Sequence, residues 1–209
     1  MLSFKYYKTS WLIPVILILA AGLDFAIVEW LIPVLKERDM DFLRAPTNVA
    51  LITGFLKVYD KYLWRFKGLN FLVNVPNMSG RYKGCVKYEW DKKKEKKPCF
   101  IEIKQTASKI KINGYFNDDN EESTDSYSLV EDIRLGEDTF YWIYFFYTNG
   151  GHKINATLDD HEGANVFKYL PAEIGGKAKL KGYYFTNRTV QTRGAIEAEY
   201  ETNKLKGTF

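Results

Sequence analysis

The pattern of apolar and polar positions changes once along this chain, across residues 59–84. Before this stretch, apolar residues recur at helical spacing in two segments. After it, short runs alternate between apolar and polar residues down to Phe209, as in strands with two unlike faces. The stretch itself mixes aromatic residues with Lys61, Arg65 and Lys67, a mixture typical of the membrane–water boundary. The pattern therefore predicts an N-terminal anchor, a hinge at residues 59–84 and a C-terminal β domain.

The first apolar segment predicts a helix that spans a membrane. Trp11 to Leu23 contains no charged residue, and an extension to residues 6–28 reaches the roughly 20 residues that a crossing needs. The helix either continues as one long, tilted element to Leu35 or breaks near Gly22 and leaves its second part at the interface. A signal peptide is the main alternative, and the second apolar segment counts against it.

The second apolar segment, residues 47–63, predicts a second spanning helix. Only about a dozen of its residues are uncharged, so an amphipathic helix that lies on the membrane is the alternative. Lys and Arg are most frequent after this segment, which favours a cytoplasmic position for the C-terminal β domain. We therefore expect a two-helix transmembrane anchor at residues 1–67 and a cytoplasmic β domain at residues 68–209.

Eight strands are expected after residue 78. They fall near residues 79–90, 98–106, 108–116, 124–135, 138–149, 161–170, 177–187 and 192–202. The charged run from Asp91 to Lys97 separates the first two as a hairpin tip. Eight short strands without intervening helices predict a closed antiparallel β-barrel, which side chains can fill or which can hold one small ligand at its mouth. The expected fold class is membrane-anchored all-β, with two N-terminal transmembrane helices before the barrel.

Composition narrows the function classes. The 209 residues carry a net charge of +4, which suits a small anionic ligand or an anionic lipid surface but does not argue for nucleic acid. The sequence has no Gly-rich phosphate loop, no His-Glu-x-x-His and no nucleophile elbow, so we expect no enzyme, no catalytic residue and no cofactor. Cys85 and Cys99 lack metal-site spacing, so no metal site is expected either.

The C-terminal run around residues 180–194 carries the candidate binding chemistry. An Arg fork with hydroxyl donors suits a phosphate, and a tyrosine face suits a stacked base. An ordinary polar hairpin is the alternative for this run, and a charged strand start is the alternative for the histidine. The predicted ligand-binding residues are Gln105, Tyr147, His161, Tyr184, Thr186, Arg188, Thr192 and Arg193.

Residues 140–147 are apolar or aromatic at every position. A strand of this kind is covered on both faces, by the core inside and by another protomer or lipid outside. The pattern thus predicts self-association or lipid contact. Core packing with scattered surface aromatics is the alternative.

Several short segments resemble one protein family. They are "YDKYLWRF" and "VPNMSGRYKG" in the hinge, "IEIKQTASKIKI" in one strand pair, "HEG" at residues 161–163, and "GYYFTNR" with "TRG" near the C-terminus. These segments are similar to the two-transmembrane, β-strand-rich effectors of bacterial CBASS anti-phage systems, over roughly residues 60–200. Tyr82 stands where that family more often has Trp, and Glu162 where it more often has a basic residue.

The resemblance implies a function that composition could not supply. In this family a nucleotidyltransferase makes a cyclic dinucleotide on phage infection, and the β-barrel binds it. The effector then oligomerises in the bacterial inner membrane and disrupts the bilayer, which causes abortive infection. No direct nucleic-acid partner is implied.

Two other functions remain open from the sequence. A membrane-tethered, lipocalin-like barrel would carry a small apolar ligand and would need an apolar interior, whereas an effector needs a basic or polar one. A structural membrane protein would use its barrel for assembly alone.

Overall fold

The computed structural model describes residues 3–38, 47–90, 93–117, 123–151, 160–188 and 191–209. The chain forms two compact units. The first unit contains Met1–Pro76 and Thr106–Lys109, and the second contains Asn77–Gln105 and Ile110–Phe209.

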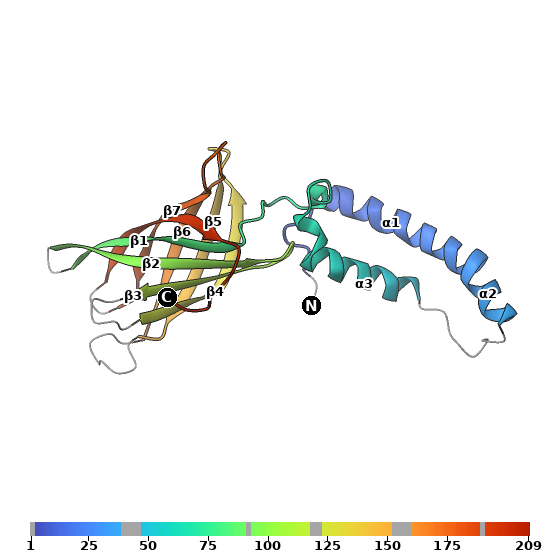
Figure 1. Cartoon of the computed structure of the whole chain (residues 1–209), viewed down its shortest axis with the longest axis horizontal. Coiled ribbons are helices and arrows are strands. Elements are labelled where there is room, and N and C mark those ends of the chain that lie inside the picture. Colours follow the sequence, from blue (N-terminus) through green and yellow to red (C-terminus); the bar gives the residue numbers. More distant parts are fainter. Residues whose placement is uncertain (1–2, 39–46, 91–92, 118–122, 152–159, 189–190) are drawn as a thin grey trace. The chain divides into compact units, whose positions relative to one another are not determined.

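One uninterrupted helix, Thr9–Glu37, dominates the first unit (Figure 1). It consists of α1 (Thr9–Ala26), the π-helical turn η1 (Ile27–Leu31) and α2 (Ile32–Glu37). The helix therefore continues through Gly22 rather than breaking there. Its 29 residues have a mean hydropathy of 2.4 in the most apolar window, and at 1.5 Å per residue they extend about 44 Å, more than the roughly 30 Å of a bilayer core. By length and composition this helix can cross a membrane.

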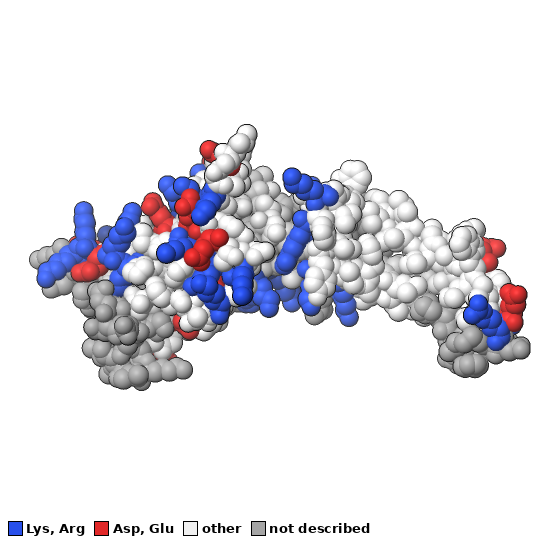
Figure 2. Space-filling model, in the orientation of Figure 1, with Lys and Arg blue, Asp and Glu red and all other residues white. Residues whose placement is uncertain are grey.

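A second helix, α3 (Asn48–Lys61), is shorter. Thr47 Oγ1 caps it by accepting a hydrogen bond from the Ala50 N–H at 3.3 Å. Its 14 residues extend about 21 Å, which is less than the bilayer core. The described residues thus show one helix that can span a membrane, and a second spanning helix is not shown. Figure 2 shows a largely uncharged surface over these helices, with charged residues towards their ends.

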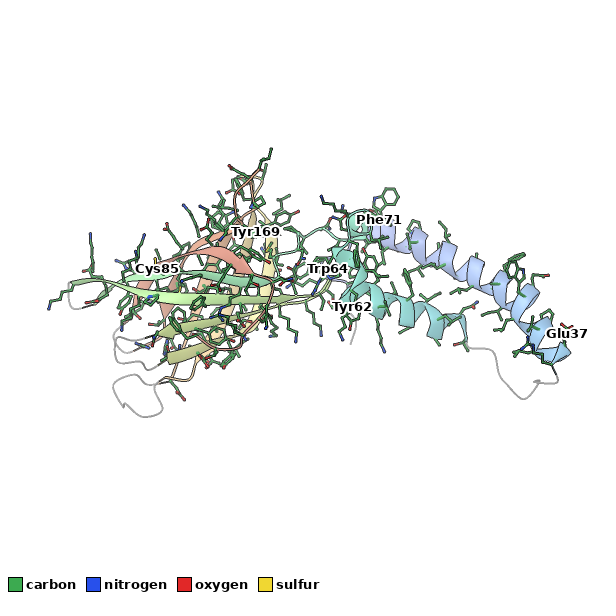
Figure 3. The ribbon with its side chains drawn as sticks, viewed as in Figure 1. Glu37, Tyr62, Trp64, Phe71, Cys85 and Tyr169 are labelled. Carbon is green, nitrogen blue, oxygen red and sulfur yellow. The ribbon has the colours of Figure 1, made fainter. Side chains whose placement is uncertain are left out.

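Residues 59–76 of the predicted hinge are a packed part of the first unit, and the rest of it belongs to the second unit and includes the start of β1 (Gly80–Trp90). The packed part contains two 3₁₀ turns, η2 (Leu63–Arg65) and η3 (Asn70–Leu72), and the side chain of Trp64 is buried (Figure 3). The segment after η3 pairs with the start of the chain, because Lys8 N–H donates to Leu72 O and Asn74 N–H donates to Tyr6 O, each at 2.8 Å. Backbone pairing therefore holds this part of the hinge in place.

The second unit is a closed barrel in which each strand pairs with the next and β8 pairs with β1, all antiparallel (Figure 1). The strands are β1 (Gly80–Trp90), β2 (Lys93–Gln105), β3 (Ile110–Asn117), β4 (Ser123–Leu135), β5 (Tyr141–Asn149), β6 (His161–Leu170), β7 (Lys179–Thr186) and β8 (Arg193–Thr202). The predicted eight-stranded antiparallel barrel is confirmed.

The charged run after β1 was wrongly assigned to a hairpin tip. β2 begins at Lys93, and Trp90 pairs directly with Lys93, so most of this run is strand. Lys93 to Lys96 are all exposed. Because this end of the hairpin is in contact with water, charged side chains are tolerated there. The alternation of apolar and polar residues that predicts a strand is therefore absent from this part of the sequence.

The lumen of the barrel is apolar along one half of its length. Alternate residues of each strand point inward, so the register identifies which side chains meet there. The buried inward residues of this apolar half include Tyr82, Ile101, Ile103, Ile112, Ile143, Phe145, Phe167, Leu180 and Ile196. These side chains form the hydrophobic core of the barrel. The strands that this core holds together continue into the other half of the lumen and position its side chains.

Candidate functional site

The other half of the lumen, which we call the polar end, is lined by hydroxyl, amide and imidazole groups. It lies where β1, β3, β5 and β7 end and β2, β4, β6 and β8 begin. Its inward residues include Tyr88, Thr124, Ser126, Ser128, Tyr147, Asn149, His161, Asn165, Tyr184, Thr186 and Thr192. A barrel interior with this many polar groups is suited to a polar ligand, because buried polar groups require hydrogen-bond partners.

Arg188 and His161 form the charged part of the polar end. One guanidinium nitrogen, Arg188 Nη2, lies 3.0 Å from His161 Nδ1 and 3.3 Å from Nε2. A guanidinium only donates hydrogen bonds, so the imidazole must be the acceptor and therefore neutral. Among the described residues, no carboxylate lies within salt-bridge distance of Arg188. Within the described part of the chain, its positive charge thus has no anionic partner.

Two tyrosine rings lie against the wall of the polar end where the opposite residue is glycine. Tyr147 pairs with Gly163, and Tyr184 pairs with Gly194. A Cβ at Gly163 would lie 2.5 Å from Tyr147 Oη, and one at Gly194 would lie 2.7 Å from a ring carbon of Tyr184. Glycine thus lets each ring lie flat against the barrel wall.

Both tyrosines remain neutral phenols. Burial raises the pKa of Tyr147 to about 12, and the nearby Arg188 charge opposes this shift. Burial also raises the pKa of Tyr184 well above its usual value, helped by Tyr147 and Tyr88. Each ring can therefore donate an O–H hydrogen bond and offer an uncharged face to a base.

Thr186 and Thr192 close the β7–β8 hairpin. Their hydroxyl oxygens lie 2.9 Å apart, and the Thr192 N–H donates to Thr186 Oγ1 at 3.1 Å. The Thr186 N–H donates to Thr192 O at 3.0 Å. The pair satisfies its own polar groups, so its evident effect is to hold the loop that carries Arg188.

The structure brings six of the eight predicted site residues together. Tyr147, His161, Tyr184, Thr186, Arg188 and Thr192 all belong to the polar end or to the loop beside it. Their roles in ligand binding remain predictions.

Two predicted site residues lie elsewhere. Arg193 is exposed and pairs with Phe185, which places its side chain on the outer face of the barrel. Gln105 lies at the other end of β2, where its Oε1 accepts the Met78 N–H at 2.8 Å. Both residues were chosen because they lie in or near segments of the family pattern. A shift of one residue along a strand turns a side chain from the lumen to the outer face, and a residue at the other end of a strand lies at the other end of the barrel.

The departure from the family pattern at Glu162 also falls outside the lumen. Glu162 is exposed and is even-numbered on β6, the outward series on that strand. Its N–H donates to Asn187 Oδ1 at 2.9 Å, which ties the strand to the β7–β8 loop. This carboxylate therefore does not line the polar end.

Sequence reasoning missed several inward residues of the polar end. Tyr88 pairs with Gly194 beside Tyr184, and Asn149 Nδ2 donates to Ser126 Oγ at 2.8 Å. Asn165 lies on the same face of β6 as His161, and its Oδ1 is buried without a hydrogen-bond partner in the described structure. The period-2 rule applied from His161 would have identified Asn165.

A second arginine, Arg81, is fully buried on the outer face of the barrel. Its Nη1 lies 2.6 Å from Glu102 Oε1, its Nε lies 3.3 Å from Glu201 Oε2, and its Nη1 donates to Thr208 O at 2.7 Å. The guanidinium also lies 3.8 Å from the centre of the Phe100 ring. Residues 203–209 cover the pair, and the Lys206 N–H donates to the carboxylate of Glu102 at 2.7 Å.

Comparison with known families identifies the barrel. No curated protein matches the chain. Residues 73–200 match the family described as "Cap15, cyclic dinucleotide receptor domain". This match covers more than half of the chain and agrees with the resemblance found in the sequence. The chain therefore belongs to the Cap15 cyclic dinucleotide receptor domain family, which is a family of CBASS effectors.

Proposed function

We propose that this protein is a CBASS effector whose barrel binds a cyclic dinucleotide at the polar end. The observation that supports this most strongly is the half-buried Arg188 guanidinium, which faces the neutral His161 imidazole and has no carboxylate partner among the described residues. A phosphate oxygen would supply the missing negative charge, and a guanidinium fork suits its geometry. The protein acts as a receptor rather than as an enzyme.

In this proposal the bases of the ligand stack on the rings of Tyr147 and Tyr184. A base that stacks on such a ring gains about 1–3 kcal/mol. The Thr186–Thr192 pair fixes the hairpin from which Arg188 extends. We therefore include Tyr147, His161, Tyr184 and Arg188 as direct contacts.

The apolar helix Thr9–Glu37 anchors the receptor in the bacterial inner membrane, with the barrel in the cytoplasm. We propose that α3 crosses the bilayer as well. Because α3 is short, its crossing requires Lys57 and Lys61 to extend towards the interface or the bilayer to thin locally. The two units thus correspond to an anchor and a cytoplasmic receptor.

Assembly of several copies follows ligand binding in this proposal. The outer faces of β4, β5 and β7 carry the exposed apolar side chains of Val130, Phe146 and Phe185, which the strand pairing aligns through the buried Ala164 of β6. Phe146 is 59% exposed and Val130 is 66% exposed. An exposed apolar face of this kind suits contact with a second copy. Assembled copies then disrupt the membrane, and the infected cell dies before phage matures.

Isothermal titration calorimetry of the full-length protein in detergent tests the binding proposal. A panel of cyclic di- and trinucleotides should include at least one ligand that binds, and light scattering should show a larger mass when that ligand is added. Binding of none of these ligands would contradict the proposed function. Binding without a change in mass would contradict ligand-driven assembly alone.

The lipocalin-like alternative fits the lumen less well. A carrier of an apolar ligand needs apolar walls where its ligand lies. The polar end instead presents a cationic Arg, an imidazole and an unpartnered amide oxygen.

A further inference from the structure

The carboxamide of Asn165 lies where the polar end meets the apolar half of the lumen. Asn165 is paired with Phe145 of β5 and Tyr184 of β7, and directly opposite residues present their side chains to the same face of a sheet. It lies four residues beyond His161 on β6, about 13 Å further along the strand. Asn165 is therefore part of the floor of the polar end.

The carbonyl oxygen of this side chain has no partner. Asn165 is 7% exposed, and its Oδ1 accepts no hydrogen bond from the described residues. A buried acceptor without a donor destabilises a folded protein, whereas an apolar side chain of the same size does not. The residue thus contributes nothing to folding that a leucine could not. Local conflicts of this kind are expected at functional sites.

The missing partner is a hydrogen-bond donor for Oδ1. A carboxamide offers an acceptor and a donor side by side, and the N7 edge of adenine offers the complementary pair, the exocyclic amine next to the ring nitrogen N7. Tyr184 lies directly opposite Asn165 and presents a ring on which a base can stack. A stacking surface and an edge-reading amide are therefore adjacent.

We propose that Asn165 selects a cyclic dinucleotide that contains adenine, by accepting a hydrogen bond from the exocyclic amine of the base. This inference rests on the proposed function, in which the same ligand places a phosphate at Arg188. Hypoxanthine has a carbonyl where adenine has the amine. On the N7 edge hypoxanthine therefore presents two acceptors, this carbonyl and N7. Even if the carboxamide turned by 180°, Asn165 Oδ1 would still face an acceptor, so the ligand should bind less tightly.

The test is calorimetry of the full-length protein in detergent with cyclic di-AMP and cyclic di-IMP. The wild-type protein should bind cyclic di-AMP more tightly than cyclic di-IMP by roughly tenfold or more. Asn165→Leu should abolish this preference, mainly by weakening the binding of cyclic di-AMP. The same variant should melt at an equal or higher temperature, because it removes an unpartnered buried oxygen. Asn113→Leu, at an amide on the outer face of β3, is the matched control and should keep the preference.

The outcomes separate the two proposals. Equal affinity of the wild-type protein for the two ligands, or tighter binding of cyclic di-IMP, overturns the role of Asn165 and leaves the receptor proposal standing. A preference that persists in Asn165→Leu also overturns it. Failure of the wild-type protein to bind any cyclic dinucleotide overturns both. The wild-type comparison needs no variant, so the inference is tested even if Asn165→Leu does not fold.

Discussion

Arg81 and Arg188 belong to the same barrel and have opposite electrostatic surroundings. Arg81 lies on the outer face, is fully buried, and has Glu102 and Glu201 within salt-bridge distance. Arg188 is half-buried beside the polar end and faces a neutral imidazole. Carboxylates of the protein thus neutralise Arg81, whereas no carboxylate of the residues that the structure describes lies within salt-bridge distance of Arg188.

This difference separates a structural arginine from a binding one. A buried charge must be paired, and Arg81 meets that requirement through the fold itself. Arg188 has no carboxylate partner among the described residues, and we propose that the phosphate of a cyclic dinucleotide neutralises its charge. Substitution should therefore affect folding stability at Arg81 and ligand affinity at Arg188.

The largest expected effect is on stability, at Arg81. Arg81→Ala leaves the carboxylate of Glu102 buried without its cation, and we expect a loss of about 3–5 kcal/mol in the free energy of unfolding. Urea denaturation measures it. Arg134→Ala is the matched control, because Arg134 pairs with Asp132 on the exposed surface, and it should change stability by less than about 1 kcal/mol. If the two variants lost the same free energy of unfolding, Arg81 would contribute no more to stability than an exposed arginine, which would contradict its structural role.

The next effect is on affinity, at Tyr184. Tyr184→Ala removes a stacking face from the polar end and should weaken cyclic dinucleotide binding by about 1–3 kcal/mol, measured by calorimetry. Tyr127→Ala is the control, since Tyr127 is an exposed tyrosine of β4 that pairs with Asn113 and Thr148 on the outer face of the barrel and does not face the lumen. A larger loss of affinity in Tyr127→Ala than in Tyr184→Ala would show that the bases of the cyclic dinucleotide do not stack on Tyr184.

The smallest effect concerns an exposed ion pair. A hydrogen bond from Lys168, with a further one from Trp142, lowers the pKa of Asp138 in the folded protein. A lowered folded-state pKa gives stability that is present above the unfolded-state value of about 3.9 and is lost as the pH falls through the folded-state value. Asp138→Asn should therefore lose stability near pH 7 and match the wild-type protein near pH 2. A difference that is the same at both pH values would contradict this linkage.

Period-2 patterning predicted the barrel well and the ends of its strands less well. Seven of the eight strands begin within three residues of the expected position, because turns rich in Gly, Asn or acidic residues punctuate them. β2 was the exception, because the exposed charged residues from Lys93 onward carry no apolar alternation. The helix Thr9–Glu37 was recognisable from hydropathy, whereas the span of α3 was not decided by its sequence and its length does not decide it either.

The candidate site was predicted in part because one hairpin carries much of it. Tyr184, Thr186, Arg188 and Thr192 are close in sequence, so a local pattern was sufficient. Asn165 and Tyr88 approach Tyr184 only through the pairing of β6 with β7 and the closure of β8 on β1. Likewise, no local pattern shows that residues 203–209 fold over Arg81 and Glu102. These contacts depend on register and closure, which a single sequence does not specify.

The measurement that tests the central claim most directly is calorimetry of Arg188→Ala and Arg134→Ala, with the cyclic dinucleotide that the wild-type protein binds best. Arg188→Ala should weaken binding by about 1.5–3 kcal/mol, which is roughly ten- to a hundredfold in affinity. Its far-UV dichroism and urea midpoint should match those of the wild-type protein, and Arg134→Ala should bind normally. Wild-type affinity in Arg188→Ala would show that this charge is a surface cation and that the ligand binds elsewhere on the barrel.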